Sequence, residues 1–215
     1  KKLNLLSDIT RHDIVNQLQG LLFVLDLAIH DEPSPSVLSY LERANNFAGN
    51  IGRQIAFTRD YQDIGVKLPD WQNVGVIIKN AARFIDLGEI ALEVTITHLE
   101  IFADPLLEKV FQNLIDNAKR YGEKITRISF SGYVQEGDYA IICADDGVGI
   151  PEIYKAGIFK REYFKHTGFG LNLSREILDI TGINISENGI EGEGARFEIL
   201  VPVDGWRIQQ KNPAT

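Results

Sequence analysis

The sequence has one cysteine, no methionine and no long apolar run. The single cysteine, Cys143, excludes an internal disulfide and a cysteine-rich metal site, which suits a reducing cytoplasm. No stretch approaches the roughly 20 consecutive apolar residues that a membrane-spanning helix requires, and we expect no signal peptide. Because the chain does not begin with methionine, we expect it to be a fragment of a longer protein.

Positive charge is also scarce. The 22 lysines and arginines against 30 aspartates and glutamates leave a formal net charge of −8. Since nucleic acids and anionic membranes favour dense lysine and arginine, we expect no nucleic acid partner and no membrane contact in this chain. The hydrophobic fraction of 44% is ordinary for a globular chain, and 215 residues allow one or two domains with a real core.

Two helices are predicted at the start of the chain. In the first, apolar residues recur at alternating steps of three and four: Val15, Leu18, Leu22, Leu25 and Ile29. The same stagger returns after the prolines of residues 31–36: Val37, Leu41, Ala44, Ala48, Ile51, Ile55 and Thr58. These patterns predict an antiparallel hairpin within residues 1–64, with helices over about 3–30 and 37–61. Since each helix has one apolar stripe, we expect two copies to form a dimeric four-helix bundle.

A polar cluster interrupts the first apolar pattern. His12, Asp13 and Asn16 lie within about one helical turn, beside the seam that begins at Val15. A lone histidine in such a position is more often a structural residue than a chemical one, so the cluster by itself predicts no reaction.

The helical periodicity lapses between residues 65 and 72, where Gly65 and Pro69 indicate a linker. Residues 73–203 mix helical and strand patterns, which predicts an α+β domain. The predicted helices span 74–87, 104–121 and 169–181, and the predicted strands span 92–97, 125–134, 139–144, 184–187 and 195–201. Residues 204–215 are predicted to be a polar, frayed tail.

Four short segments of this domain indicate a nucleotide site. The first contains Asn113 and Asn117, four residues apart on one helix face, where two carboxamides offer oxygens to a hard cation such as Mg²⁺. Arg120, one turn further on, is placed to reach a phosphate.

The second segment is ADDGVGIP (144–151), at the end of a strand. A carboxylate there can accept a hydrogen bond from an amino group, and the glycines let the backbone approach a planar ring.

The other two segments are rich in glycine. The third, TGFGL (167–171), precedes a helix, an arrangement in which backbone amides and a helix N-terminus bind phosphates. The fourth, GEGARF (192–197), leads into a strand that is placed to close a base pocket. Taken singly, each of the four segments has a plain structural alternative: asparagines on a solvated helix face, an Asp-Gly turn, an isolated glycine pair or a hairpin.

In order and spacing, the four segments resemble the asparagine box and the three glycine boxes of the ATP-binding domain of sensor histidine kinases in two-component systems. The helical hairpin resembles the dimerisation and histidine phosphotransfer domain of that family, so the resemblance covers about residues 5–203. It implies an α+β chain in which the hairpin precedes a Bergerat-type (GHKL) α/β sandwich, a mixed sheet with helices on one face. It also implies a cytoplasmic fragment of a longer sensor protein, of a kind that can be membrane-associated.

The resemblance assigns roles by matched position. Asn117 corresponds to the principal Mg²⁺ ligand with Asn113 supporting it, and Asp145 corresponds to the carboxylate that binds the adenine amino group. The other matched residues contact phosphates or shape the pocket and its lid: Arg120, Tyr121, Gly147, Gly149, Thr167, Gly168, Phe169, Gly170 and Leu171. A lid cation such as Lys165 or His166 either neutralises phosphates or is simply solvated. The expected cofactors are ATP and Mg²⁺.

With an ATP site present, the polar cluster gains a function. His12 corresponds to the phosphoryl acceptor, and Asp13 is placed to orient the imidazole and stabilise its developing positive charge. Asn16 is placed to position a water for removing phosphate from a docked partner. The motif is atypical, because no proline follows and Ile14 and Val15 replace the usual basic and threonine-like residues. The implied partners are the receiver domain of a response regulator and a second copy of this chain.

Two other classes of function stay open. A clamp ATPase of the gyrase or MutL kind resembles the same fold, but it places a water-activating glutamate where this chain has Asn113, which cannot act as a general base. A non-catalytic dimeric phosphotransfer scaffold with a decayed ATP site is favoured only by Ala195, where the family often has threonine. Binding of Mg-ATP separates the scaffold from the two enzymes.

Overall fold

The computed structural model describes residues 2–31, 33–160 and 169–209, and for residues 2–13, Arg53 and Phe169 it describes the backbone alone. The chain divides into two compact units, Lys1–Tyr61 and Gln62–Thr215. In the described ranges, no helix has both the length and the apolar composition needed to cross a bilayer.

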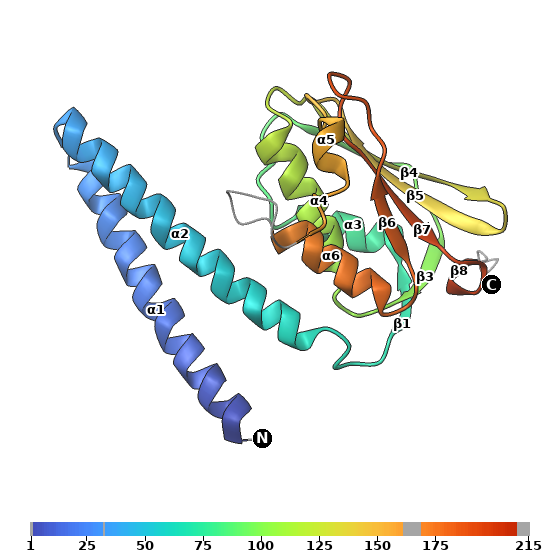
Figure 1. Ribbon diagram of the computed structural model, residues 1–215, viewed down its shortest axis with the longest axis horizontal. Helices are drawn as coiled ribbons and strands as arrows, with labels where there is room; N and C mark the ends of the chain where they lie inside the picture. Colours follow the sequence, from blue (N-terminus) through green and yellow to red (C-terminus); the bar gives the residue numbers. More distant parts are fainter. Residues whose placement is uncertain (1, 32, 161–168, 210–215) are drawn as a thin grey trace, which may run out of the picture. The chain divides into compact units, whose positions relative to one another are not determined.

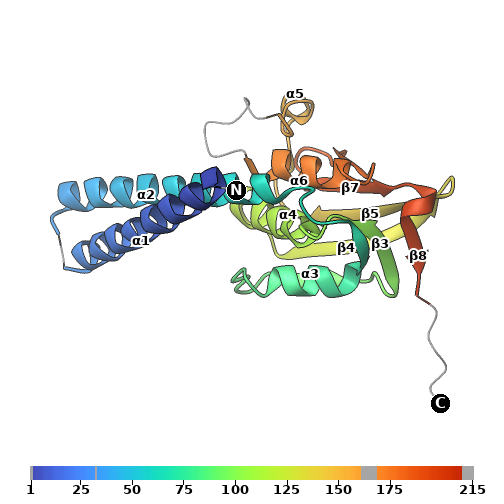
Figure 2. The ribbon, with the colours of Figure 1, turned by 90° about the horizontal axis from the view of Figure 1, so that it is seen from below.

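The first unit is a pair of antiparallel helices. α1 (Lys2–His30) and α2 (Pro35–Asp63) lie side by side in both views (Figures 1 and 2). Every residue of the predicted α1 seam, from Val15 to Ile29, is half-buried. Gly52 lets the helices approach closely, since a Cβ there would lie 3.2 Å from Leu18 Cδ2.

The predicted stripe on α2 is only partly correct. Its buried or half-buried members are Leu41, Ala44, Ala48 and Ile55. Its exposed members are Val37, Ile51 and Thr58. Members seven residues apart share one edge of the stripe, and the hairpin covers the edge of Leu41, Ala48 and Ile55 while most of the other edge stays exposed. Further large apolar side chains of the hairpin are exposed as well: Ile14, Leu21, Phe23, Val24, Leu27, Tyr40 and Phe47.

The second unit is built on a five-stranded mixed sheet. Its strands are β2 (Ala91–Val94), β4 (Arg127–Gln135), β5 (Asp138–Asp145), β7 (Arg196–Val201) and β6 (Asn184–Glu187), in that spatial order. The β2–β4 pair is parallel and the other pairs are antiparallel. The two-residue turn between β4 and β5 has positive φ at Glu136 and Gly137, which suits the twist of a hairpin.

Three helices cover one face of this sheet (Figure 1). They are α3 (Val74–Ala82), α4 (Leu107–Tyr121) and α6 (Phe169–Asp179). The core lies between the layers, where Phe111 of α4 meets Phe130 of β4 edge-on with ring centroids 5.8 Å apart. The predicted sandwich, with a mixed sheet and helices on one face, is therefore present in this unit. α3 ends earlier than predicted, because turns occupy the stretch that follows Ala82.

A second, smaller sheet corrects two of the predicted boundaries. It consists of β1 (Asp70–Asn73), β3 (Leu99–Ala103) and β8 (Trp206–Ile208), all antiparallel. The linker predicted at 65–72 thus contains most of β1, and the tail predicted at 204–215 contains the end of a 3₁₀ turn, η1 (Val203–Gly205), followed by β8. Both strands are too short to show a clear alternation in the sequence.

Tertiary contacts hold these short elements in place. Trp206 donates from its ring nitrogen to the Gly137 carbonyl oxygen at 3.0 Å and packs against Tyr139 at a centroid distance of 5.2 Å. In the predicted linker, the Gly65 amide donates to the buried Asp104 carboxylate at 2.9 Å. Asp104 also accepts from the Leu106 amide just before α4, so one carboxylate joins the linker to the start of that helix.

Candidate functional site

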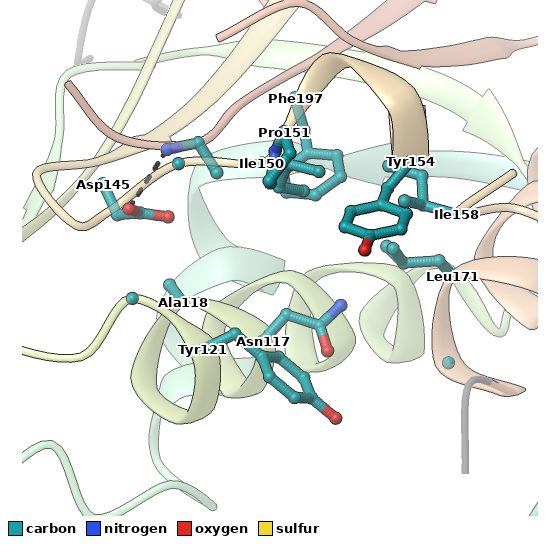
Figure 3. Close-up of a pocket in the computed structure, with 14 residues that line it drawn as sticks. Asn117, Ala118, Tyr121, Asp145, Ile150, Pro151, Tyr154, Ile158, Leu171 and Phe197 are labelled. Atoms are coloured by element: carbon teal, nitrogen blue, oxygen red, sulfur yellow. Dashed lines mark hydrogen bonds between the residues drawn. The ribbon is translucent and has the colours of Figure 1, made fainter. Parts of the chain in front are cut away.

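A pocket opens beside the C-terminal half of α4 (Figure 3). It is lined by Asn117, Ala118, Tyr121, Gly122, Asp145, Gly149, Ile150, Pro151, Tyr154, Ile158, Gly170, Leu171, Ala195 and Phe197. All four of the segments singled out in the sequence contribute to this lining. Its walls are mostly apolar, with a few polar side chains among them, which is the usual composition of a small-molecule site.

Asp145 supplies the carboxylate of the pocket. It is the last residue of β5, and its Oδ1 accepts hydrogen bonds from the amides of Gly147 at 2.9 Å and Ala195 at 3.2 Å. Burial raises the pKa of Asp145, these two hydrogen bonds oppose the rise, and the charges of Asp146 and Glu187 add to it. The backbone therefore fixes a partly desolvated carboxylate that can accept a hydrogen bond from a ligand amino group.

The neighbouring Asp146 has a different role. Its carboxylate accepts from the hydroxyl of Thr126 at 2.5 Å and from the amides of Thr126 and Arg127 at 2.9 and 3.0 Å. The hydrogen bond from the Thr126 hydroxyl, followed by that from the Arg127 amide, lowers the pKa of Asp146 to about 2. Of the two adjacent acids, only Asp145 lines the pocket, and Asp146 secures the start of β4.

The glycines of the second segment are required by close backbone packing. Gly149 has a φ of 71°, and a Cβ there would lie 2.7 Å from the Ile190 carbonyl oxygen. A Cβ at Gly147 would lie 2.6 Å from Gly122 Cα, at the end of α4. Gly149 thus lines the pocket, whereas Gly147 holds the turn against the helix that carries Asn117.

The two predicted metal ligands differ in their surroundings. Asn117 lines the pocket, with its carboxamide directed toward the open space (Figure 3). Asn113, one turn earlier, donates its amide to the Gly170 carbonyl oxygen at 2.9 Å and to Ser174 Oγ at 3.1 Å. The amide nitrogen of Asn113 is therefore engaged with α6.

Arg120 and Tyr121 are separated in the structure. Tyr121 lines the pocket although its side chain is 55% exposed. Arg120 does not line it, and its Nε lies 2.7 Å from the Asp116 carboxylate one turn earlier on α4. The family resemblance placed Arg120 at the phosphates and Tyr121 at the aromatic position of the same segment, and this local ion pair competes with the phosphate role of Arg120.

Several predicted site residues lie wholly or partly outside the described residues. Lys165, Thr167 and Gly168 are among them, and so are the side chains of His12, Asp13 and Phe169. Their backbones place His12 and Asp13 on α1 and Phe169 at the start of α6. Asn16 is exposed on α1, about one turn after His12. Gly170 and Leu171, the next residues of α6, line the pocket.

The pocket also contains residues that the sequence did not single out. Ala118 comes from α4, while Tyr154 and Ile158 come from α5 (Glu152–Lys155) and the turn after it. α5 is only four residues long, which is too short to give a periodic signal. The only sequence sign of Tyr154 is an aromatic residue soon after a glycine-rich turn.

Comparison with known proteins identifies the domain. Residues 103–205 match the family model described as "Histidine kinase-, DNA gyrase B-, and HSP90-like ATPase". Over 131 residues the chain is 31% identical to the circadian input-output histidine kinase CikA of Synechococcus elongatus, covering 54% of this chain and 17% of the relative. Over 144 residues it is 32% identical to the alginate biosynthesis sensor protein KinB of Pseudomonas aeruginosa, covering 60% and 24%. Residues 103–205 therefore form an ATP-binding domain of the histidine kinase-, DNA gyrase B- and HSP90-like type.

Solved structures of histidine kinases share this fold. Full-length ShkA, whose crystal structure is a complex with AMPPNP, matches with a TM-score of 0.63 at 20% identity, over 91% of this chain and 45% of that chain. The histidine kinase AdeS of Acinetobacter baumannii matches with a TM-score of 0.56 at 19% identity, over 89% and 96%. The chain spans only 17% to 24% of the length of the first three curated relatives.

Proposed function

We propose that the chain is the kinase portion of a two-component sensor, which uses Mg-ATP to phosphorylate His12 and passes the phosphoryl group to an aspartate of a response regulator. The observation that carries the proposal is the pocket. It combines the fixed, partly desolvated carboxylate of Asp145 with the carboxamide of Asn117, and it lies in an ATP-binding domain of the histidine kinase-, DNA gyrase B- and HSP90-like type.

The lining of the pocket suits an adenine nucleotide. Asp145 would accept a hydrogen bond from the adenine amino group, and apolar side chains such as Ile150 and Phe197 would contact the flat ring. The N-terminal turn of α6, with Gly170 in the lining, would offer backbone amides and the positive end of a helix dipole to phosphates. These features give the base and the phosphates chemically matched neighbours.

A magnesium ion would be held at Asn117. The described residues contain no group of three or more histidine, cysteine or acidic side chains that could hold a metal alone. A hard cation that takes the Asn117 oxygen together with phosphate oxygens and water fits this chemistry. When bound, the ion supplies charge neutralisation of the phosphates. The amide nitrogen of Asn113 is engaged with α6, so this residue would offer the ion its carboxamide oxygen in a supporting part.

His12 is proposed as the acceptor on the first helix. An imidazole attacks through one nitrogen while the other keeps its proton, and Asp13 next to it would hold that proton and stabilise the imidazolium. Asn16, about one turn later, would position the water for removing phosphate from the regulator, so the same helix would serve kinase and phosphatase reactions. Asn113 stands where a clamp ATPase needs a proton acceptor, which disfavours simple ATP hydrolysis.

The exposed apolar side chains of the hairpin support a dimer. Phe23, Val24, Tyr40 and Phe47 are each more than 60% exposed in one copy. So many large exposed apolar side chains are unusual on a monomer, and a four-helix bundle of two helical hairpins would bury part of them.

The test is labelling with γ-phosphate-labelled ATP. Acid-labile label is expected on the wild-type chain and absent from His12→Gln. His30→Gln is the matched control, because His30 is also on α1, where its Nδ1 bonds to the Asp26 carbonyl oxygen at 2.8 Å. Acid-labile label that persists in His12→Gln would reject the assignment. Mixing His12→Gln with Asn117→Ala then reports the direction of transfer, since label in the mixture requires transfer between protomers.

A further inference from the structure

The segment from α5 to Phe159 forms one wall of the pocket, and a buried ion pair anchors its first half. Lys155 Nζ lies 3.3 Å from Glu187 Oε2 and donates to the Gly189 carbonyl oxygen at 2.5 Å. The Glu187 side chain is fully buried, and its other oxygen accepts from the amides of Gly189 and Arg196 at 3.0 and 3.2 Å. The Lys155–Glu187 pair therefore joins α5 to the end of β6.

Lys155 keeps its charge in this position. Burial lowers the pKa of Lys155, but its hydrogen bonds and charge interactions with Glu187 and Glu152 outweigh that effect and leave the pKa raised. Glu152 also lies 3.3 Å from Nζ, yet its side chain is 87% exposed. The two carboxylates are thus at the same distance from one ammonium group and differ in burial.

A second anchor holds the other end of the segment. Phe159 is buried, its ring lies edge-on to Phe197, and the Arg175 guanidinium lies 4.2 Å from the ring centroid. The Asn172 amide also donates to the Phe159 carbonyl oxygen at 3.2 Å. Since Arg175 and Asn172 belong to α6, the segment is fixed between β6 and α6.

These anchors present Tyr154 to the pocket. Figure 3 shows its ring across the open space from Asn117, with the hydroxyl directed into that space and Asp145 at the opposite end. If Asp145 holds the base, the part of a nucleotide that passes Tyr154 is the sugar and its first phosphates. An aromatic ring beside such a ligand excludes water and packs against it.

We propose that Tyr154 is a further ligand-contacting residue of the nucleotide site, its ring covering the ribose side of the ligand, and that Lys155 and Glu187 are the positioning residues that hold it there. This inference rests on the proposed function only in taking an adenine nucleotide as the ligand. The ring covers the ribose side, which ATP and ADP share, so the affinities for both nucleotides should depend on the ring equally.

The experiment is calorimetric titration of the full chain with Mg-ATP and Mg-ADP. Tyr154→Ala is expected to weaken both nucleotides by about tenfold and by the same factor, whereas Tyr154→Phe stays within about twofold of wild type. Ile153→Ala is the matched control, because Ile153 is on the same short helix and 73% exposed. Should Tyr154→Ala lower the melting temperature, Tyr154→Leu keeps apolar bulk without the ring and should give an intermediate loss.

The anchoring role has its own pair of variants. Glu187→Gln should weaken nucleotide binding and Glu152→Gln should not, although both remove a carboxylate 3.3 Å from Lys155. In the Tyr154→Ala background, Glu187→Gln should cause no further loss, because it acts through Tyr154. If the losses of nucleotide affinity in the two single variants add up in the double variant, Glu187 does not act through Tyr154, and its positioning role is overturned.

The outcomes separate this inference from the proposed function. Wild-type chain that binds neither nucleotide at millimolar concentration overturns both. Wild-type binding that Tyr154→Ala leaves unchanged overturns the inference alone. Binding that falls in Tyr154→Ala, in a chain that does not label His12, supports the inference and rejects the kinase assignment.

Discussion

The side-chain amide of Asn113 donates to the main-chain oxygen of Gly170, 2.9 Å away, and so joins α4 to α6 beside the pocket. Ser174, one turn further along α6, accepts from the same amide at 3.1 Å. Gly170 permits this contact, since a Cβ there would lie 3.3 Å from Asn113 Oδ1. Asn113, which was predicted to be a supporting metal ligand, therefore makes a hydrogen bond that joins the two helices beside the pocket.

Replacing this amide with a carboxylate should destabilise the fold. We expect Asn113→Asp to lower the free energy of unfolding by about 2 kcal/mol, because a carboxylate would face the Gly170 carbonyl oxygen with no proton to donate. Urea unfolding at neutral pH measures the change. Asn184→Asp, exposed on β6, is the control and should change the free energy by less than about 0.5 kcal/mol. Equal stabilities for the two variants would contradict the helix-joining role.

Asp145 should show a conflict between stability and binding. Burial first of all raises its pKa, so the folded state holds the proton more tightly, and the resulting stabilisation is lost as pH rises through the folded pKa. Asp145→Asn keeps an oxygen for the Gly147 and Ala195 amides and never ionises. It should therefore melt at a higher temperature than wild type at pH 7, and the difference should vanish below the ordinary value of 3.8.

The same variant should lose the nucleotide. Its affinity for Mg-ATP should fall by about 10- to 100-fold, because a charged acceptor for the adenine amino group is gone. Thermal melts across pH and calorimetric titration give the two measurements. Asp179→Asn, exposed on α6, should change neither. Unaltered ATP affinity in Asp145→Asn would remove this carboxylate from the proposed base site.

Asp146→Asn should have the opposite pattern. The Thr126 hydroxyl and the Arg127 amide lower the pKa of Asp146 to about 2, so its contribution to stability is present above the unfolded pKa and is lost as pH falls through the folded pKa. The variant should melt below wild type at pH 7, and the two melting curves should converge between pH 3.8 and about 2. ATP affinity should stay within about twofold of wild type, since Asp146 does not line the pocket.

The sequence grouped several residues that line one pocket, because the order of its motifs reflects strand and helix ends. Asp145 ends β5, Gly170 lies in the first turn of α6 and Ala195 precedes β7, and the fold brings these ends to one pocket. Tyr154 could not be found in this way, because a four-residue helix leaves no periodic pattern. The strands β1 and β8 were missed because each is too short to show an alternating pattern. They are held by contacts between residues distant in sequence, such as that of Trp206 with Tyr139.

Arg120 shows a different limit of sequence reasoning. The family resemblance assigned it to a phosphate, but Asp116 lies four residues earlier on the same helix face. An acid and a base at this spacing form an ion pair on many helices, and here the two groups lie 2.7 Å apart. The local competitor was visible in the sequence, and the phosphate role of Arg120 stays a prediction.

The exposed apolar side chains of the hairpin predict that a charged substitution among them will weaken the dimer. Phe47 is 63% exposed on α2, and Phe47→Glu should convert a dimer to a monomer of 24.1 kDa. A buried unpaired carboxylate at such an interface costs several kcal/mol, enough to raise the dissociation constant by more than about 100-fold. Light scattering after size exclusion measures the mass, and Asn46→Glu, also exposed, is the control. A wild-type chain that is already monomeric would contradict the bundle.

The metal dependence of the site should follow Asn117 and not Arg120. Asn117→Ala should abolish labelling of His12, and its remaining nucleotide binding should no longer respond to magnesium, because the proposed protein oxygen for the cation is removed. Arg120→Ala should keep labelling within about threefold of wild type, since its guanidinium is paired with Asp116. Titrations with and without a chelator, beside the labelling assay, measure both effects. Loss of labelling in Arg120→Ala with Asn117→Ala still active would reverse the two roles and restore the phosphate assignment for Arg120.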